Sequence, residues 1–130
     1  MRKIFISAGH SNKPGRDRGA EGNGYIEGDL SVEFRNNLYN ELVKLGITPI
    51  IDDNNTILSE SITFFKNKTS SNSIVLDIHW NAATPQATGT ETLIPGDSTN
   101  FERKLAEDLS LIVSSTLGIP LRGPKGVKTE

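Results

Sequence analysis

The chain has 130 residues and a formal net charge of −2, so it fits one compact domain without an excess of positive charge. A nucleic-acid partner is therefore not expected, because binding to phosphates relies on a basic surface. Hydrophobic residues make up 35% of the sequence, and glycine and proline are scattered rather than periodic, which excludes a collagen-like or disordered chain. Since cysteine is absent, a zinc site here would need histidine and carboxylate ligands.

The first elements are predicted from one apolar run and one helical repeat. The apolar run at 3–8 predicts a buried strand and is too short for a signal peptide. The glycine-rich segment 9–28 predicts a long irregular loop. Apolar residues at three- and four-residue spacing then predict a helix over 30–45, with Gly46 as a left-handed cap.

The middle of the chain alternates strand and helix patterns. A second strand is expected at 47–51, followed by a helix from Leu58 with Ser59 near its N-cap. The Ser/Asn-rich segment 69–73 would end that helix. The run 74–79 is apolar on both faces, which is typical of a central strand covered by helices.

The last third of the chain shows one more strand and one more helix. Thr-rich β-formers at 88–94 predict the strand, and the repeat over 101–116 predicts the helix, with Ser98 or Thr99 as N-cap. No strand pattern is found in the tail 119–130. No segment is long and apolar enough to span a membrane.

The order of these elements predicts an α/β fold with a mostly parallel or mixed central sheet and helices on both faces. We interpret residues 1–130 as a single domain.

Both histidines of the chain follow apolar strands. His10 comes after the first strand and His79 after the third. Ligands collect at the carboxyl ends of strands in open α/β sheets, so the two imidazoles could meet there around a metal ion. Taken alone, either histidine could instead be an ordinary hydrogen-bonded residue. A third zinc ligand would be Glu27 or Asp29. Spacing leaves this choice open, because either carboxylate could instead be there only to interact with the positive end of the helix dipole.

Several other charged residues could serve the site or have a purely structural role. Asp77 shares a strand face with His79 and could orient it, or could be a satisfied carboxylate at the end of the sheet. Asp17 and Glu21 are expected to be solvated. A basic group in the same loop could meet an anionic substrate or simply be exposed; its members are Lys13, Arg16 and Arg18.

Five segments, in order, resemble the zinc-dependent N-acetylmuramoyl-L-alanine amidases, which include bacterial cell-wall amidases and phage endolysins. These segments are FISAGH at 5–10, RGA at 18–20, YIEGDL at 25–30, DIHWNA at 77–82 and GTE at 89–91. Each is short, but the ordered set is specific and spans nearly the whole chain.

The resemblance implies one zinc ion bound by His10, Glu27 and His79, and so favours Glu27 over Asp29. It implies that the substrate is peptidoglycan and that the reaction is hydrolysis of the amide between N-acetylmuramic acid and L-alanine. Asn81 could hydrogen-bond substrate or support its loop. A bacterial enzyme would act outside the cell, in the wall or periplasm, as an autolysin does, whereas a phage endolysin would pass from the host cytoplasm to the wall.

The chain departs from the family at two places. In the family, a glutamate that serves as general acid/base lies on a strand that follows a segment similar to residues 122–128. Here the sequence ends at Glu130, which follows that segment too closely to be the equivalent glutamate. Glu91 matches a different position. We therefore expect a catalytic domain truncated at its C-terminus, which keeps the metal ligands but lacks one catalytic carboxylate. That loss could leave it inactive, and its catalytic base stays unassigned. In addition, Ser61 stands where many relatives carry an arginine in the second helix.

Two other functions fit the same residues. The chain could be a non-catalytic zinc- or peptidoglycan-binding module of the same fold. It could also be a metal-free protein-interaction domain in which both histidines are structural. The oligomeric state is left open.

Overall fold

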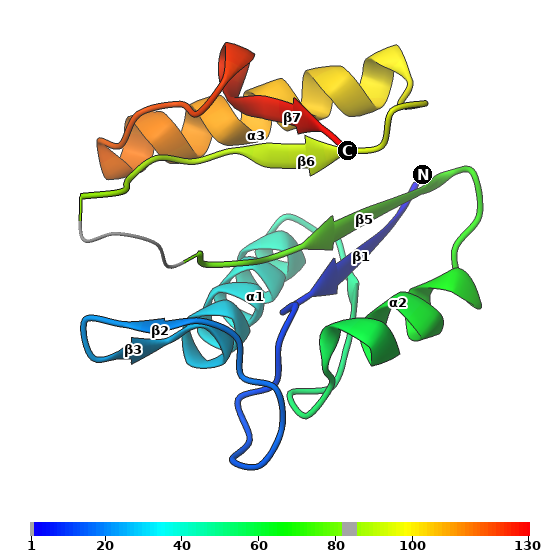
Figure 1. Ribbon diagram of the computed structural model, residues 1–130. Helices are drawn as coiled ribbons and strands as arrows, with labels where there is room; N and C mark the ends of the chain where they lie inside the picture. Colours follow the sequence, from blue (N-terminus) through cyan, green and yellow to red (C-terminus); the bar gives the residue numbers. More distant parts are fainter. Residues whose placement is uncertain (1, 82–85) are drawn as a thin grey trace. The chain divides into compact units, whose positions relative to one another are not determined.

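The computed structural model describes residues 2–81 and 86–130, and its contacts group into two compact units, residues 1–82 and 83–130 (Figure 1). The first unit contains a parallel sheet of order β4-β1-β5, two helices and a short hairpin. Their bounds are β1 Lys3–Ser7, β2 Glu21–Gly22, β3 Tyr25–Ile26, α1 Glu27–Lys44, β4 Ile50–Ile51, α2 Leu58–Lys66 and β5 Ser73–Asp77. The single domain over 1–130 stays a prediction.

The core of the first unit is built on β1, the central strand of its sheet. Phe5 and Ile6 are both fully buried, and their side chains point to opposite faces because the strand period is two. Phe5 packs edge to face on Phe65 of α2, with 5.6 Å between ring centroids. Both faces of β1 are therefore covered, as expected for an α/β fold with a parallel sheet. The central position belongs to β1, whereas β5 was expected there.

Helix α1 begins three residues before the predicted helix, and the preceding loop explains why. The first backbone N–H groups of a helix have no partner inside the helix. Here Glu27 donates its N–H to the carbonyl of Ala20 at 2.8 Å, and Gly28 donates to that of Arg18 at 2.8 Å. The predicted loop 9–28 thus caps the helix, and it also forms the β2-β3 hairpin. Gly46 has the expected positive φ, +82°.

Ser59 lies near the N-cap of α2, as expected, but it is not the cap residue. The helix begins at Leu58, so the cap position is Ile57, which has no side-chain acceptor. Glu60 compensates, because its carboxylate accepts the backbone N–H of Ile57 at 3.1 Å. The predicted strand at 47–51 is reduced to Ile50–Ile51.

The second unit pairs β6 (Thr92–Ile94) in parallel with β7 (Val127–Thr129), beside helix α3 (Asn100–Leu117) and the 3-10 turn η1 (Pro124–Gly126). The expectation of a strandless tail is wrong. Strand β7 has three residues and only Val127 is buried, too short a pattern to be read from the sequence. Thr99 is the N-cap of α3, as predicted: its hydroxyl accepts the N–H of Glu102 at 3.2 Å.

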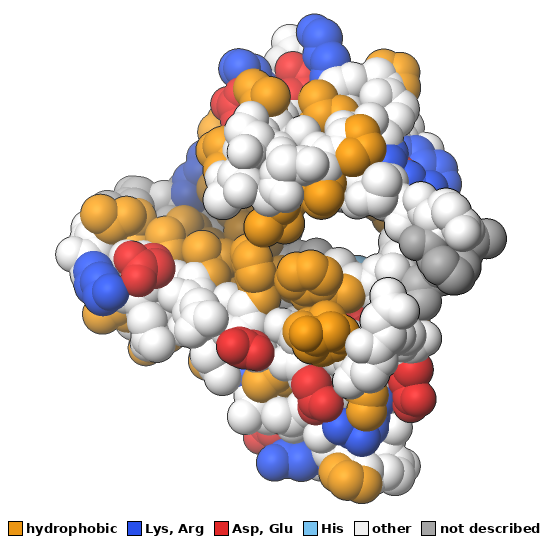
Figure 2. Space-filling model, turned by 90° about the vertical axis from the view of Figure 1, so that its left-hand side faces the viewer, with side chains coloured by type: hydrophobic (Ala, Val, Ile, Leu, Met, Phe, Trp, Pro, Cys, Tyr) orange, Lys and Arg blue, Asp and Glu red, His pale blue; other side chains and the backbone are white. Residues whose placement is uncertain are grey.

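On the face seen in Figure 2, lysine and arginine side chains are interspersed with acidic and apolar ones. Among the described residues, no helix is both long enough and apolar enough to cross a membrane.

Candidate metal centre

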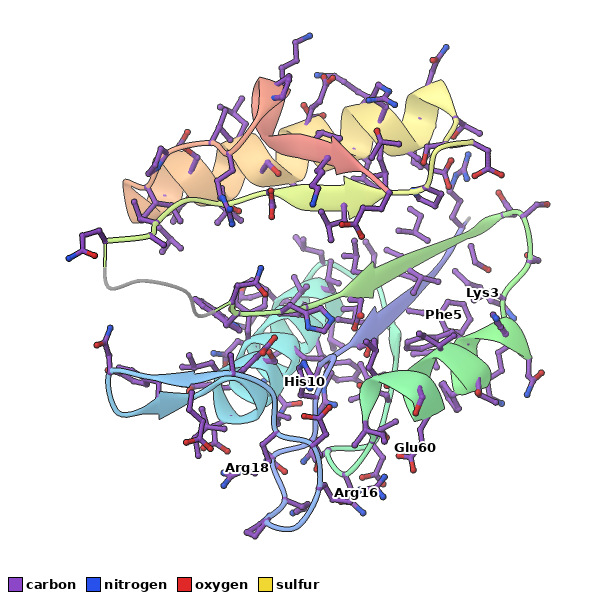
Figure 3. The ribbon with its side chains drawn as sticks, viewed as in Figure 1. Lys3, Phe5, His10, Arg16, Arg18 and Glu60 are labelled. Atoms are coloured by element: carbon purple, nitrogen blue, oxygen red, sulfur yellow. The ribbon has the colours of Figure 1, made fainter. Side chains whose placement is uncertain are left out.

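The side chains of His10, Glu27 and His79 meet at one edge of the first unit's sheet. His10 follows the end of β1 (Figure 3), Glu27 is the first residue of α1, and His79 lies two residues beyond β5. Strands β1 and β5 are parallel neighbours, so their carboxyl ends lie at the same edge. One potential ligand atom from each of the three side chains lies within 4.8 Å of the other two.

The carboxylate of Glu27 lies between the two imidazoles and is only 5% exposed. Oε1 is 3.0 Å from Nδ1 of His79, and Oε2 is 3.5 Å from Nε2 of His10. Each oxygen also accepts a backbone N–H at 2.9 Å, Oε1 from Trp80 and Oε2 from Ala20. The main chain therefore orients this carboxylate toward both rings.

The outward nitrogen of each imidazole also faces a carboxylate. Asp77 Oδ2 is 2.8 Å from Nε2 of His79, a hydrogen-bond distance. Asp17 Oδ1 is 3.5 Å from Nδ1 of His10, without hydrogen-bond geometry. The hydrogen bond with Asp77 is the largest cause that raises the pKa of His79; the charges of Asp77 and Glu27 add to it, and burial opposes it.

Two glycines allow the close approach of these side chains. Gly9 and Gly19 both have positive φ, +75° and +77°. A Cβ atom at position 9 would lie 2.7 Å from Cε1 of His79, and one at position 19 would lie 2.5 Å from Oε2 of Glu27. A side chain at either position would collide with the cluster.

The remaining candidates of the loop point elsewhere. Asp29 pairs with Arg18 at 3.0 Å and is half exposed, so Glu27 is the carboxylate that joins the histidines. Arg16 forms an ion pair with Glu60, which is visible in Figure 3. Two of the three basic residues that could have met an anionic substrate, Arg16 and Arg18, are therefore paired with neighbouring carboxylates.

Other candidates are exposed or lie in the second unit. Glu21 and Asn81 are exposed. Asp17 is exposed as expected, yet it also reaches toward His10. Glu91 belongs to the second unit, where it lies 3.5 Å from Arg122.

Sequence reasoning missed the two backbone donors that hold Glu27. They are the N–H groups of Ala20 and Trp80, and every residue except proline has such a group. No residue type or spacing could have revealed them.

The chain matches the model of the N-acetylmuramoyl-L-alanine amidase family over residues 4–129, almost its whole length. It belongs to this amidase family. The resemblance drawn from the five segments is thereby confirmed.

Individual amidases and one further protein are similar to the chain. The crystal structure of N-acetylmuramoyl-L-alanine amidase from Clostridium difficile 630 superposes with a TM-score of 0.75 at 25% identity, covering 99% of this chain and 69% of that one. Ami1, the amidase from Mycobacterium smegmatis, shares the fold with a TM-score of 0.67 at 14% identity, covering 99% and 73%. The uncharacterized protein YqiI of Bacillus subtilis (strain 168) is 31% identical over 126 residues, which are 94% of this chain. The chain spans 59% of the length of YqiI.

In this amidase-family chain, the donor set of the cluster fits zinc. It consists of two imidazole nitrogens and one carboxylate oxygen, a combination typical of hydrolytic zinc sites with an open fourth position. Calcium and magnesium prefer oxygen ligands only. Burying the charged carboxylate of Glu27 also costs free energy, and a divalent ion bound beside it would offset that cost.

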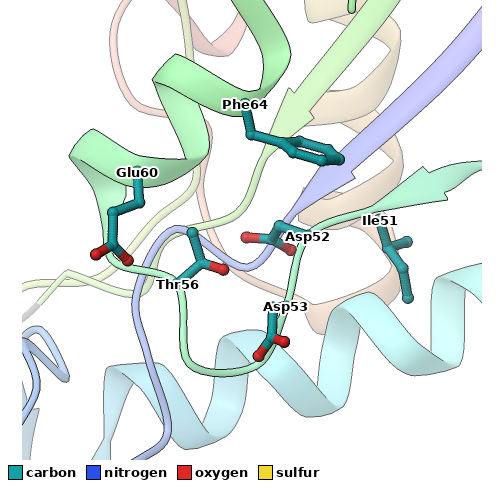
Figure 4. A pocket seen from close by; sticks show the side chains of 6 residues that line it. All are labelled: Ile51, Asp52, Asp53, Thr56, Glu60 and Phe64. Carbon is teal, nitrogen blue, oxygen red and sulfur yellow. The ribbon is translucent and has the colours of Figure 1, made fainter.

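A pocket beside α2 and β4 is separate from the metal centre (Figure 4). None of the three clustered side chains lines it; the lining residues are Ile51, Asp52, Asp53, Thr56, Glu60 and Phe64. Asp52, its most buried carboxylate, already accepts hydrogen bonds from Ser7, Ser61 and Arg35. This pocket is therefore bordered by a structural network.

Proposed function

We propose that this chain binds one zinc ion through His10, Glu27 and His79 and hydrolyses the amide between N-acetylmuramic acid and L-alanine in peptidoglycan. The observation that carries the proposal is the approach of these three side chains to within 4.8 Å, around a buried carboxylate. Membership of the amidase family supports it, as does the similarity to the amidase of Clostridium difficile.

Each residue has a defined part in this proposal. The histidines offer ring nitrogens, and Glu27 offers a carboxylate oxygen whose direction is set by the N–H groups of Ala20 and Trp80. Zinc bound there would supply a Lewis acid for the amide carbonyl and would lower the pKa of a bound water toward neutral pH. Holding the ligands in place before binding reduces the reorganisation that binding requires.

A second candidate function is a zinc- and peptidoglycan-binding module without turnover. The observation in its favour is the placement of the carboxylates nearest the cluster. Asp17 and Asp77 lie at the ring nitrogens that face away from Glu27, so neither is placed to exchange a proton with a molecule held between the three ligands. The general acid/base is therefore not assigned to either residue.

The metal arm of the test measures zinc content and affinity of the whole chain. We expect one zinc per chain, and we expect Glu27→Gln to weaken zinc binding by more than the roughly 10–100-fold loss typical of changes outside the ligand set. Asp29→Asn is the matched control, because it removes a carboxylate two residues away that pairs with Arg18. Zinc absent from the wild-type chain, or equal loss in both variants, would overturn the ligand assignment.

The activity arm measures dye release from labelled peptidoglycan. The amidase proposal expects release that a chelator stops and added zinc restores. Stoichiometric zinc with binding to peptidoglycan but no release would support the second candidate instead.

A further inference from the structure

The two imidazoles of the metal centre turn different ring nitrogens toward Glu27. His10 directs Nε2 toward Glu27, at 3.5 Å, whereas His79 directs Nδ1 toward it, at 3.0 Å. Their rings are nearly perpendicular, at 86°, with centroids 5.1 Å apart. The two rings thus present different nitrogens to the space between them.

The opposite nitrogen of His79 is bound to a carboxylate. Nε2 lies 2.8 Å from Oδ2 of Asp77, the last residue of β5. An ionised carboxylate can only accept a hydrogen bond, so Asp77 favours a proton on Nε2. Nδ1 is also at hydrogen-bond distance from a carboxylate, 3.0 Å from Oε1 of Glu27, but a metal ion bound by Glu27 would take the place of that contact. The one proton of a neutral ring would then stay on Nε2, and Nδ1 would offer its lone pair to the metal ion.

The corresponding contact of His10 is much weaker. Its Nδ1 is 3.5 Å from Oδ1 of Asp17, lacks hydrogen-bond geometry and has no other hydrogen-bond partner among the described residues. Asp17 sits in the loop and its side chain is 60% exposed, whereas Asp77 is fixed by the register of β5 with β1. The two carboxylates therefore differ in how firmly they hold their rings.

We propose that zinc is bound through Nε2 of His10 and Nδ1 of His79, and that Asp77 is the positioning residue that sets this choice for His79. The inference rests on the metal site of the proposed function and adds which atoms bind and what orients them. Partners of metal-bound imidazoles of this kind typically change metal affinity about 10–100-fold when they are removed.

The direct test is the tautomer of each histidine in the zinc-loaded whole chain, from long-range proton–nitrogen-15 correlations in NMR spectra. We expect the proton of His79 on Nε2 and that of His10 on Nδ1. A zinc-loaded protein in which His79 carries its proton on Nδ1 would overturn the inference while leaving the proposed function intact. A wild-type chain that binds no zinc would overturn both.

Variants provide an independent measurement. Asp77→Ala is expected to weaken zinc binding by about 10–100-fold, and Asp77→Asn, which keeps an acceptor oxygen, is expected to recover part of that loss. Asp17→Ala is the matched control and should change the affinity less than Asp77→Ala. Equal effects of the two alanine variants, or an unchanged His79 tautomer in Asp77→Ala, would contradict the role of Asp77; should that variant not fold, the wild-type spectrum decides alone.

Discussion

Gly19 shows how a residue without a side chain can control the metal centre. A Cβ atom there would lie 2.5 Å from Oε2 of Glu27, which faces both His10 and the N–H of Ala20. Gly15, in the same loop, has a similar φ of +84°, but a Cβ atom added to it would contact nothing within 4 Å. The two glycines thus share the backbone demand and differ only in the neighbouring space.

We therefore expect Gly19→Ala to weaken zinc binding, because the new methyl group displaces the Glu27 carboxylate. Gly15→Ala should cost only the strain of a positive φ, about 1–2 kcal/mol, and leave zinc affinity unchanged. Zinc titrations and urea unfolding of both variants separate these effects. Equal zinc affinities would mean that the carboxylate adapts without loss.

The raised pKa of His79 predicts how zinc affinity depends on pH. The hydrogen bond with Asp77, and then the charges of Asp77 and Glu27, favour the protonated ring, whereas zinc needs a free nitrogen. Zinc affinity should therefore be constant well above this raised pKa and fall as the pH drops through it, beginning at a higher pH than for an ordinary histidine.

The zinc-free fold should show the opposite trend. Contacts of protonated His79 stabilise it below pH 6.5, the ordinary value, and that contribution is lost as the pH rises through the raised pKa. Zinc dissociation constants and urea midpoints measured between about pH 5 and 9 test both trends. A zinc affinity that declines only below the ordinary histidine range would contradict the raised pKa.

At the scale of secondary-structure elements, a buried ion pair joins α1 to the segment after β4. Arg35 of α1 and Asp52 are almost fully buried and 2.9 Å apart. Asp52 also accepts the hydroxyl of Ser7, at the end of β1, and that of Ser61, on α2. The cation beside Asp52 therefore comes from α1, and α2 contributes only the hydroxyl of Ser61.

This arrangement predicts a large loss of stability in Arg35→Met. The change leaves Asp52 buried without its cation, which typically costs about 3–5 kcal/mol. Arg16→Met, which breaks the more exposed ion pair with Glu60, should cost much less, because solvent screens that pair. Free energies of unfolding in urea, measured for both variants, test this expectation. Similar losses in the two variants would show that the buried ion pair stabilises the fold no more than the exposed one.

The helices were more predictable than the strands. Apolar spacing located α1 and α3, and Thr99 was recognised as a cap because its hydroxyl is a common partner of a free helix N–H. Ser59 also carries a hydroxyl, but at the start of α2 it is the carboxylate of Glu60 that accepts the N–H of the cap residue Ile57. Strand β7 was missed because it is formed by pairing with β6, and three residues are too few to show a strand pattern in the sequence.

At the scale of the whole molecule, the metal centre joins positions far apart in the sequence, all within the first unit. The proposed ligands stand at positions 10, 27 and 79, after β1, at the start of α1 and after β5. The position of each histidine just after a strand predicted that the two could meet, but the choice of Glu27 over Asp29 came from the family resemblance. Spacing alone could not decide it, since both residues lie in the first turn of the same helix.

This arrangement predicts that zinc stabilises the first unit. A ligand that binds only the folded state at one hundred times its dissociation constant adds about 2.7 kcal/mol. Hydrogen exchange with and without a chelator should show the largest change in protection near the three ligands, at 7–28 and 76–81. A change centred on α3 would contradict a metal site in the first unit.

The only tryptophan of the sequence, Trp80, directly follows a proposed ligand. Its peptide N–H is bonded to Glu27, and its indole ring packs edge to face on Phe34 with 6.2 Å between centroids. Because the indole is about one-third exposed, its intrinsic fluorescence responds to small shifts of the ring relative to water. The native chain therefore carries an optical reporter beside the proposed metal centre, and we expect zinc binding to change its emission without any label.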